Sequence, residues 1–113
     1  MWSSTDFYTI TMQDGSSFTV RFNALHPIFA GHFPGHPIVP GACLVQMAED
    51  LSALVIGRPV RFTAVRNLKF RQPLTPDAEV TVALQCEQSN IKCQIADSAS
   101  FSATYMCLGS DVQ

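Results

Sequence analysis

Residues 31–50, GHFPGHPIVPGACLVQMAED, join a turn-rich loop directly to an apolar segment. Prolines and glycines punctuate residues 24–40, and they forbid a long regular element because proline lacks an N–H and glycine admits positive φ. From residue 41 onward, apolar positions recur at helical spacing as far as Gly57, which is a stop signal. Apolar residues cover most of the circumference, so the sequence predicts a helix over 41–56 that is buried rather than on a surface.

The segments on both sides of this helix have the composition of strands. FYTITM (7–12) and SFTVRF (17–22) flank an Asp-Gly turn signal, and together they predict a hairpin. Four further strands are predicted after the helix, at 60–70, 79–88, 91–97 and 99–109. Two strands, one buried helix and four strands predict an α+β fold in which an antiparallel sheet curls around a central helix. We expect a single domain over residues 1–113.

Size and charge narrow the functional classes. A chain of 113 residues with a formal net charge of −2 suits one domain, whose core an oligomer interface often supplements. No basic run is long enough for a nucleic-acid-binding tail, and the longest apolar run is too short for a membrane span. The four cysteines show no CxxC pairing, and the first residues lack the pattern of a signal peptide. We therefore expect a cytoplasmic protein with reduced thiols.

The loop places His32 eight residues before Pro40, where the helix begins. A helix N-terminus offers free amides and partial positive charge, which suit a developing oxyanion. A base beside such amides can remove a proton from the carbon next to a carbonyl if an acid group completes the site. The alternative is a structural loop histidine. A metal site is not expected, because the three histidines lie in a loop with no accompanying carboxylate or cysteine.

GHFPGHPIVPG (31–41) closely resembles the signature of the β-hydroxyacyl-acyl-carrier-protein dehydratases of fatty acid synthesis, the FabZ/FabA type. The likeness continues in PIFAGHFPG upstream, in KFRQPLTPDAEV in the next strand and in FSATYMCL near the C-terminus, so it covers roughly residues 26–109. The resemblance implies a hot-dog fold, in which a sheet wraps around one helix. It also implies elimination of water from a 3-hydroxyacyl thioester to a trans-2-enoyl thioester, with no redox cofactor and no metal.

The same resemblance assigns roles to individual residues. His32 matches the catalytic histidine, which handles the proton at C2 of the thioester. Gly41 matches the residue whose backbone N–H polarises the thioester carbonyl. The other expected substrate contacts are Phe33, Pro40 and Ala42. The family pairs its histidine with a carboxylate on the central helix of the other subunit, in a tunnel at a dimer interface, and Gln46 occupies that position here.

Gln46 is the main departure from the family pattern. A neutral amide can hydrogen-bond a hydroxyl but cannot donate a proton to it as water leaves. The family tends to carry a glutamine four residues later, where this chain has Asp50, so amide and carboxylate are exchanged on one helix face. We favour a dehydratase whose acid is Asp50 or, less directly, Glu49. The alternatives are a thioesterase using His32 and Gln46, and an acyl-binding or partner-dependent subunit without its own chemistry.

Partners follow from charge and from the resemblance. Five cations fall in one short segment after the helix: Arg58, Arg61, Arg66, Lys69 and Arg71. They predict a docking face for the acidic surface of acyl carrier protein, although coenzyme A phosphates would be attracted equally and a solvated strand is the simpler reading. We expect at least a homodimer with the site at its interface, and we keep open a trimer of dimers or a heteromeric partner.

Two further expectations concern the substrate. Phe29, Phe33 and Phe70 would suit the wall of an acyl tunnel, although core packing explains them equally well. The link between the last two predicted strands, at Asp97-Ser98, is shorter than we expect for the housekeeping enzymes. This compactness, together with Gln46, suggests a specialised pathway such as a secondary lipid or polyene assembly line.

Overall fold

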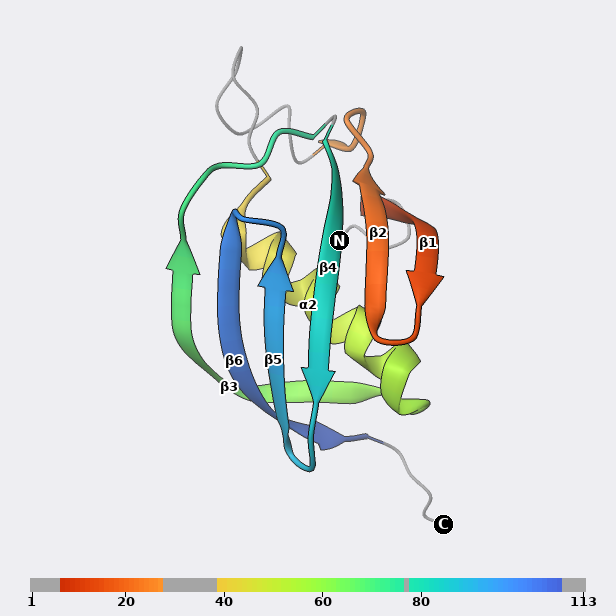
Figure 1. Ribbon diagram of the computed structural model, residues 1–113, viewed down its shortest axis with the longest axis vertical. Coiled ribbons are helices and arrows are strands. Elements are labelled where there is room, and N and C mark those ends of the chain that lie inside the picture. The colour runs from red at the N-terminus through yellow and green to blue at the C-terminus, as the bar shows by residue number, and fades with distance from the viewer. Residues whose placement is uncertain (1–6, 28–38, 77, 109–113) are drawn as a thin grey trace.

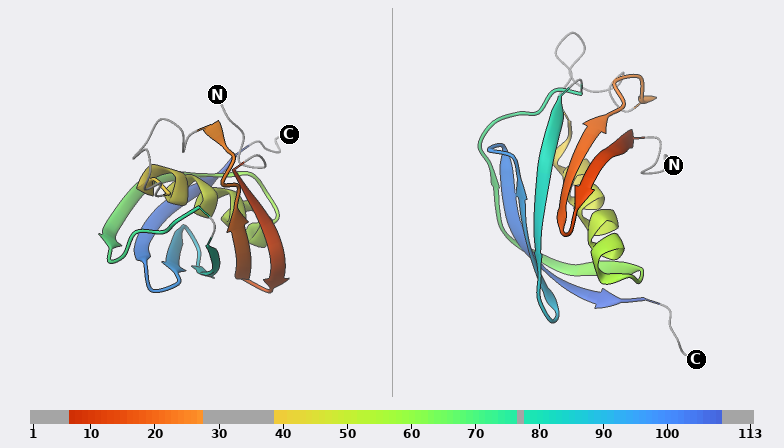
Figure 2. Two further views of the ribbon diagram at one scale, coloured as in Figure 1. Left: turned by 90° about the horizontal axis from the view of Figure 1, so that it is seen from above. Right: turned by 45° about the vertical axis from the view of Figure 1, so that its right-hand side comes forward.

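The protein is described by a computed structural model that covers residues 7–27, 39–76 and 78–108. Its elements are β1 (Tyr8–Asp14), β2 (Ser17–Phe22), α2 (Gly41–Ile56), β3 (Val60–Phe70), β4 (Glu79–Cys86), β5 (Asn90–Ile95) and β6 (Ala99–Cys107). Figure 1 shows the strands as one curved sheet with α2 lying across it, and Figure 2 shows the sheet curling around the helix. The predicted α+β class, the bounds of the helix and the order of the elements are confirmed.

The sheet is antiparallel throughout, with the strand order β1-β2-β4-β5-β6-β3. The predicted hairpin closes at Asp14 and Ser17 through Gly15, whose φ of 62° is left-handed and therefore suits glycine. β1 and β3 form the two edges of the sheet. β3 pairs only with β6 among the described strands, so one side of its backbone faces away from the ladder.

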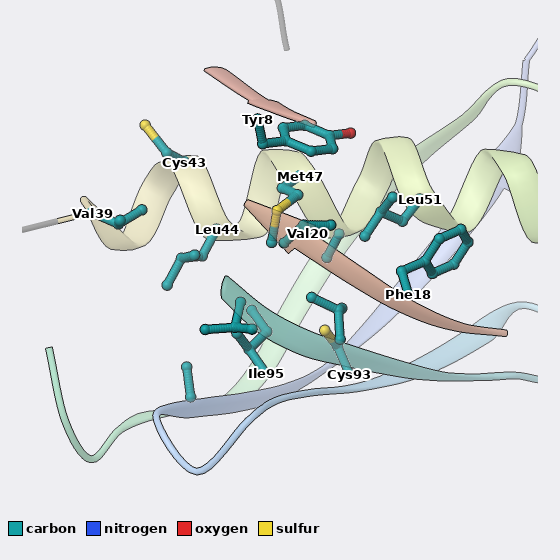
Figure 3. Close-up of a cluster of buried hydrophobic side chains, with 14 of the residues drawn as sticks. Tyr8, Phe18, Val20, Val39, Cys43, Leu44, Met47, Leu51, Cys93 and Ile95 are labelled. Atoms are coloured by element: carbon teal, nitrogen blue, oxygen red, sulfur yellow. The ribbon is translucent and has the colours of Figure 1, made fainter. Parts of the chain in front are cut away.

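The core lies between α2 and the inner face of the sheet. Alternate residues of β4 and β5 point inward, as the two-residue period of a strand requires. They meet the buried side of α2, and Figure 3 shows Leu44 and Met47 of that side pointing toward the strands. The buried residues of α2 are Cys43, Leu44, Met47, Ala48, Leu51 and Ser52. The opposite side of α2 carries exposed residues such as Gln46 and Leu54. The expectation of an all-round buried helix is therefore wrong for a single chain, because the sheet covers only one side of it.

Strand ends differ from the sequence prediction where the backbone turns. β4 ends at Cys86 and β5 runs from Asn90 to Ile95, because Ser89 and Ala96 adopt left-handed φ values of 71° and 47°. The link between β5 and β6 is three residues long, which confirms the predicted short connection at Asp97-Ser98. Within the described ranges, no helix combines the length and the apolar character that crossing a membrane requires.

Candidate functional site

The first turn of α2 is an uncapped helix N-terminus. Pro40 precedes it in an extended conformation, with φ −63° and ψ 142°, and contributes no side-chain cap. The N–H groups of Cys43 and Leu44 already donate to the Pro40 carbonyl, at 3.0 and 3.3 Å. The earlier amides of a helix have no acceptor within the helix, and no acidic residue lies in this first turn. The end of α2 at Gly41 therefore carries partial positive charge that no acidic side chain of its first turn compensates.

A mostly apolar groove of about 470 Å³ opens beside this helix end. Its walls include Val39, Pro40, Gly41, Leu44, Phe70 and Leu74, and Arg71 adds a cation. The Phe70 ring lies against Gly41 so closely that a methyl group there would be 2.5 Å from its Cζ atom. Phe70 is nevertheless 53% exposed, because it ends an edge strand. Only glycine at position 41 leaves room for the ring in this place.

A polar cluster lies further along α2, on its outward face. The Gln46 side-chain amide donates from Nε2 to Glu49 Oε1 at 3.2 Å and to Asp50 Oδ1 at 3.3 Å. The other Glu49 oxygen accepts the Phe62 backbone N–H of β3 at 2.7 Å. The second Asp50 oxygen, Oδ2, is buried and accepts no hydrogen bond from any described residue. Asp50 therefore has one oxygen held by Gln46 and one buried oxygen without a partner among the described residues.

In this geometry Gln46, Glu49 and Asp50 differ in the chemistry that each can perform. Gln46 acts as a donor to two carboxylates, and an amide cannot supply a proton in general acid catalysis. Both Glu49 oxygens are already engaged, one of them by the backbone of another element. Of the two carboxyl groups, Asp50 alone has an oxygen without a hydrogen-bond partner among the described residues.

The structure places the predicted site residues in two groups. Pro40 and Gly41 line the groove, whereas Ala42 is exposed at the first turn and is not part of its lining. Gln46 and Asp50 are in contact one helical turn apart, as their spacing predicted. Gly41 and Asp50 are nine residues apart on one helix, which corresponds to about 13 Å. His32 and Phe33, like Phe29, lie outside the described residues.

The five predicted docking cations do not gather at one point. Arg58 lies just beyond the end of α2, Arg61 and Arg66 lie along β3, and Arg71 follows its last residue. Arg61 and Arg71 are therefore separated by about 30 Å of strand contour. Arg66 is held by the side chains of Thr104 and Asn90. Arg71 is the member that lines the groove at Gly41.

Two residues make contacts that their sequence context did not signal. His26 closes a turn through its N–H, which donates to the Asn23 carbonyl at 3.0 Å. Its ring is 3% exposed and stands edge-on to Phe7 with the centroids 5.6 Å apart. Glu49 was predicted only as an indirect acid, yet it joins α2 to β3 through Phe62. The available signal for Glu49 was its i, i+3 spacing from Gln46, which places both on one face. Its strand partner could not be identified without the fold.

Cys43 also lies in the first turn of α2, where a thiol can become reactive. Its side chain is buried in the core, and burial raises the pKa of the Cys43 thiol. A nucleophilic cysteine requires a lowered pKa and access to solvent. Cys43 is therefore a core residue.

Comparison with known proteins adds a family. Residues 10–105 match the ApeI-like family, described as ApeI dehydratase. The chain is 36% identical to the 3-hydroxyacyl-(acyl-carrier-protein) dehydratase FabZ of Gluconobacter oxydans, over 56% of this chain and 43% of that protein. The match thus spans less than half the length of that relative.

Solved structures with low sequence identity share the fold. The dehydratase heterocomplex ApeI:P from Xenorhabdus doucetiae superimposes with a TM-score of 0.70 at 15% identity, over 89% of this chain and 94% of that one. Thioesterase HI1161 from Haemophilus influenzae gives a TM-score of 0.55 at 13% identity, over 94% and 82%. These likenesses confirm the hot-dog fold. Because the fold occurs in a dehydratase and in a thioesterase, the fold alone does not select the reaction.

Proposed function

Because the chain belongs to the ApeI-like family of dehydratases, we propose that it eliminates water from a 3-hydroxyacyl thioester to give a trans-2-enoyl thioester. The observation that carries this proposal is the Asp50 carboxyl group. One of its oxygens is held by Gln46, and the other is buried with no partner among the described residues. Burial of an unpaired carboxylate oxygen is costly, so it is best explained by a group that binds there.

In the proposed reaction, His32 takes a proton from C2 of the acyl chain. The electrons of the C2–H bond form the C2=C3 double bond, and the C3 hydroxyl leaves as water after accepting a proton from Asp50. The negative charge that develops on the thioester oxygen is stabilised by the N–H groups at the start of α2, with Gly41 first among them. The apolar groove beside Gly41 accommodates the acyl chain, since each buried CH₂ contributes about 0.8 kcal/mol.

The proposed site needs two chains. The thioester carbonyl at C1 and the hydroxyl at C3 are separated by only one carbon atom, whereas Gly41 and Asp50 of one α2 are about 13 Å apart. Asp50 would therefore come from a second chain. The support for pairing is β3, an edge strand on which Val65, Leu68 and Phe70 are between 39% and 53% exposed. We propose that β3 joins a second copy or a related hot-dog chain, because an unpaired apolar edge is otherwise an aggregation hazard.

The carrier of the acyl group is proposed from charge. Arg71 at the groove and Lys69 two residues before it would attract an acyl carrier protein or the phosphates of coenzyme A. A docking contact of this kind weakens as salt is added. A specialised lipid or polyene pathway remains our proposal for the source of the acyl chain.

The decisive experiment is turnover of a 3-hydroxyacyl-acyl-carrier-protein by the purified protein, with both enoyl product and free thiol measured. We expect enoyl product from the wild type. Asp50→Asn is expected to lower the rate ~100- to 10,000-fold, because general acid help is lost. His32→Ala is expected to remove product as well. Lys92→Ala, a change on the outer face of β5, is the matched control and leaves the rate unchanged.

Other outcomes separate the alternatives. Free thiol in place of enoyl product would make the protein a thioesterase. Activity that appears only in Gln46→Glu would show that Asp50 is not the acid. The third outcome is that the protein alone forms neither product but turns the substrate over once a second hot-dog chain is added. That result would show a partner-dependent subunit. Sedimentation of the protein alone and mixed with that chain measures which pair forms.

A further inference from the structure

Glu49 stands between the edge strand and the candidate acid. One of its oxygens accepts the Phe62 N–H of β3 at 2.7 Å, and the other accepts a Gln46 N–H at 3.2 Å. The same Gln46 nitrogen donates to Asp50 at 3.3 Å. A continuous chain of hydrogen bonds therefore runs from the backbone of β3 through Glu49 and Gln46 to Asp50.

The start of this chain lies beside an irregularity in the sheet. The register between β3 and β6 shifts between Phe62 and Ala64. Phe62 pairs with Tyr105 of β6 and donates its N–H to a side chain of α2. Glu49 thereby satisfies a backbone donor on an edge strand and is itself fixed in place, because a charge-assisted hydrogen bond is among the stronger kinds.

The donor count explains why an amide occupies position 46. The Gln46 nitrogen carries two hydrogens, and two carboxylates lie within reach of it. A carboxylate at position 46 would instead face Glu49 and Asp50, and like charges at these spacings destabilise a helix. The amide thus turns two neighbouring acids into an ordered pair, in which one carboxylate is anchored to β3 and the other presents an oxygen.

We propose that Glu49 is a positioning residue: anchored by β3, it orients the Gln46 amide, which holds Asp50 so that Oδ2 faces the substrate. This inference rests on the proposed function for the role of Asp50 in turnover. The inference goes beyond the proposed function because it makes the geometry of Asp50 depend on β3, through Glu49 and Gln46, which transfer no proton themselves.

Two isosteric variants test this relay from opposite ends. An amide has one acceptor oxygen, so Glu49→Gln can keep either the Phe62 contact or the Gln46 contact in this geometry, but not both. Asp50→Asn can keep its single contact to Gln46 through the remaining oxygen. The readouts are the side-chain amide signals of Gln46 and the backbone amide signal of Phe62 in ¹⁵N–¹H spectra. Glu79→Gln, which changes an exposed glutamate beside Arg21 on another part of the sheet, is the control.

We expect Glu49→Gln to shift the Gln46 or the Phe62 signal, whereas Asp50→Asn and Glu79→Gln leave the Phe62 signal in place. In turnover, Glu49→Gln is expected to lower kcat about tenfold with KM unchanged, because one orienting hydrogen bond is lost while the acid remains. A Glu49→Gln protein with unchanged Gln46 and Phe62 signals would overturn the relay. The relay would also be overturned if Glu49→Gln kept the wild-type kcat while Asp50→Asn abolished turnover.

The spectra do not depend on catalysis, so the two proposals fail separately. If the wild type shows no turnover but Glu49→Gln still shifts the Gln46 signals, the proposed dehydratase function is wrong and the relay is still supported. If Glu49→Gln does not fold, Gln46→Ala replaces it, because that change frees Asp50 and leaves the Phe62–Glu49 contact intact. A lowered kcat with an unmoved Phe62 signal then supports the relay, and an unchanged kcat contradicts it.

Discussion

The two faces of α2 come from the same sixteen residues but follow different rules. The inner face is apolar and packs on the sheet, with Met47, Ala48 and Leu51 completely buried. The outer face places Gln46, Glu49 and Asp50 together and leaves one carboxylate oxygen unsatisfied by the described chain. Apolar periodicity accounts for the first face, and helical spacing brings the three polar residues of the second face together, but it does not explain the carboxylate oxygen that has no partner among the described residues. Residues that break local rules without a compensating contact are candidates for function.

The largest contrast in stability is expected between two leucines of this helix. Leu51 is 0% exposed and faces the sheet, whereas Leu54 is 54% exposed. Leu51→Ala should lower the free energy of unfolding by about 2–5 kcal/mol, because it removes buried surface and leaves a cavity. Leu54→Ala should cost less than about 1 kcal/mol. Urea denaturation of both variants measures the difference.

The same pair of variants also probes the outer face for a partner. A loss in Leu54→Ala as large as that in Leu51→Ala would mean that the outer face is packed in solution. In that case the loss should diminish on dilution, since oligomers dissociate at low concentration. Equal losses that do not depend on concentration would contradict the assignment of the two faces.

A smaller effect on stability is expected from deprotonation of a buried thiol on the sheet side of the core. Cys93 of β5 points toward α2 (Figure 3), and burial, with a smaller contribution from Cys86, raises the pKa of its thiol to about 12. The unfolded thiol has a pKa of 9.0. Below pH 9 both states keep the proton. Between pH 9 and about 12 only the unfolded state releases it, so stability falls as pH rises, by at most about 1.4 kcal/mol per pH unit.

Urea denaturation at pH 8, 9 and 10 checks this slope against Cys93→Ala, so that tyrosine and lysine titration cancels in the comparison. The wild type should lose more stability than the variant above pH 9. Parallel pH profiles for the two proteins would show that Cys93 is not the group responsible.

The parts of the fold that were predicted from sequence are those with a strong local signal. The helix bounds follow from apolar spacing and from Gly57, whose φ of 86° is left-handed at the C-cap. The hairpin follows from the Asp-Gly turn. The ends of β4 and β5 were not predicted, because Ser89 and Ala96 take left-handed conformations that their residue types do not signal.

The candidate site was predictable only where it lies on one element. The contact between Gln46 and Asp50 follows from helical spacing, and the structure reproduces it. The contact between Glu49 and Phe62 joins residues thirteen positions apart, and it lies beside a register shift in β3. The Phe70 ring against Gly41 likewise requires the path of the chain after the helix. Neither long-range contact leaves a periodic signal in the sequence.

The smallest expected effect concerns the one polar side chain on the inner face of α2. Ser52 is 0% exposed, and its hydroxyl donates to the Ala48 carbonyl at 2.7 Å, within its own helix. Ser52→Ala loses that hydrogen bond but leaves no buried donor, and alanine has the higher helix propensity. The free energy of unfolding should therefore change by less than about 1 kcal/mol. A loss comparable to that of Leu51→Ala would mean that the hydroxyl has a partner beyond its own helix, and the inner face would then be more than an apolar surface.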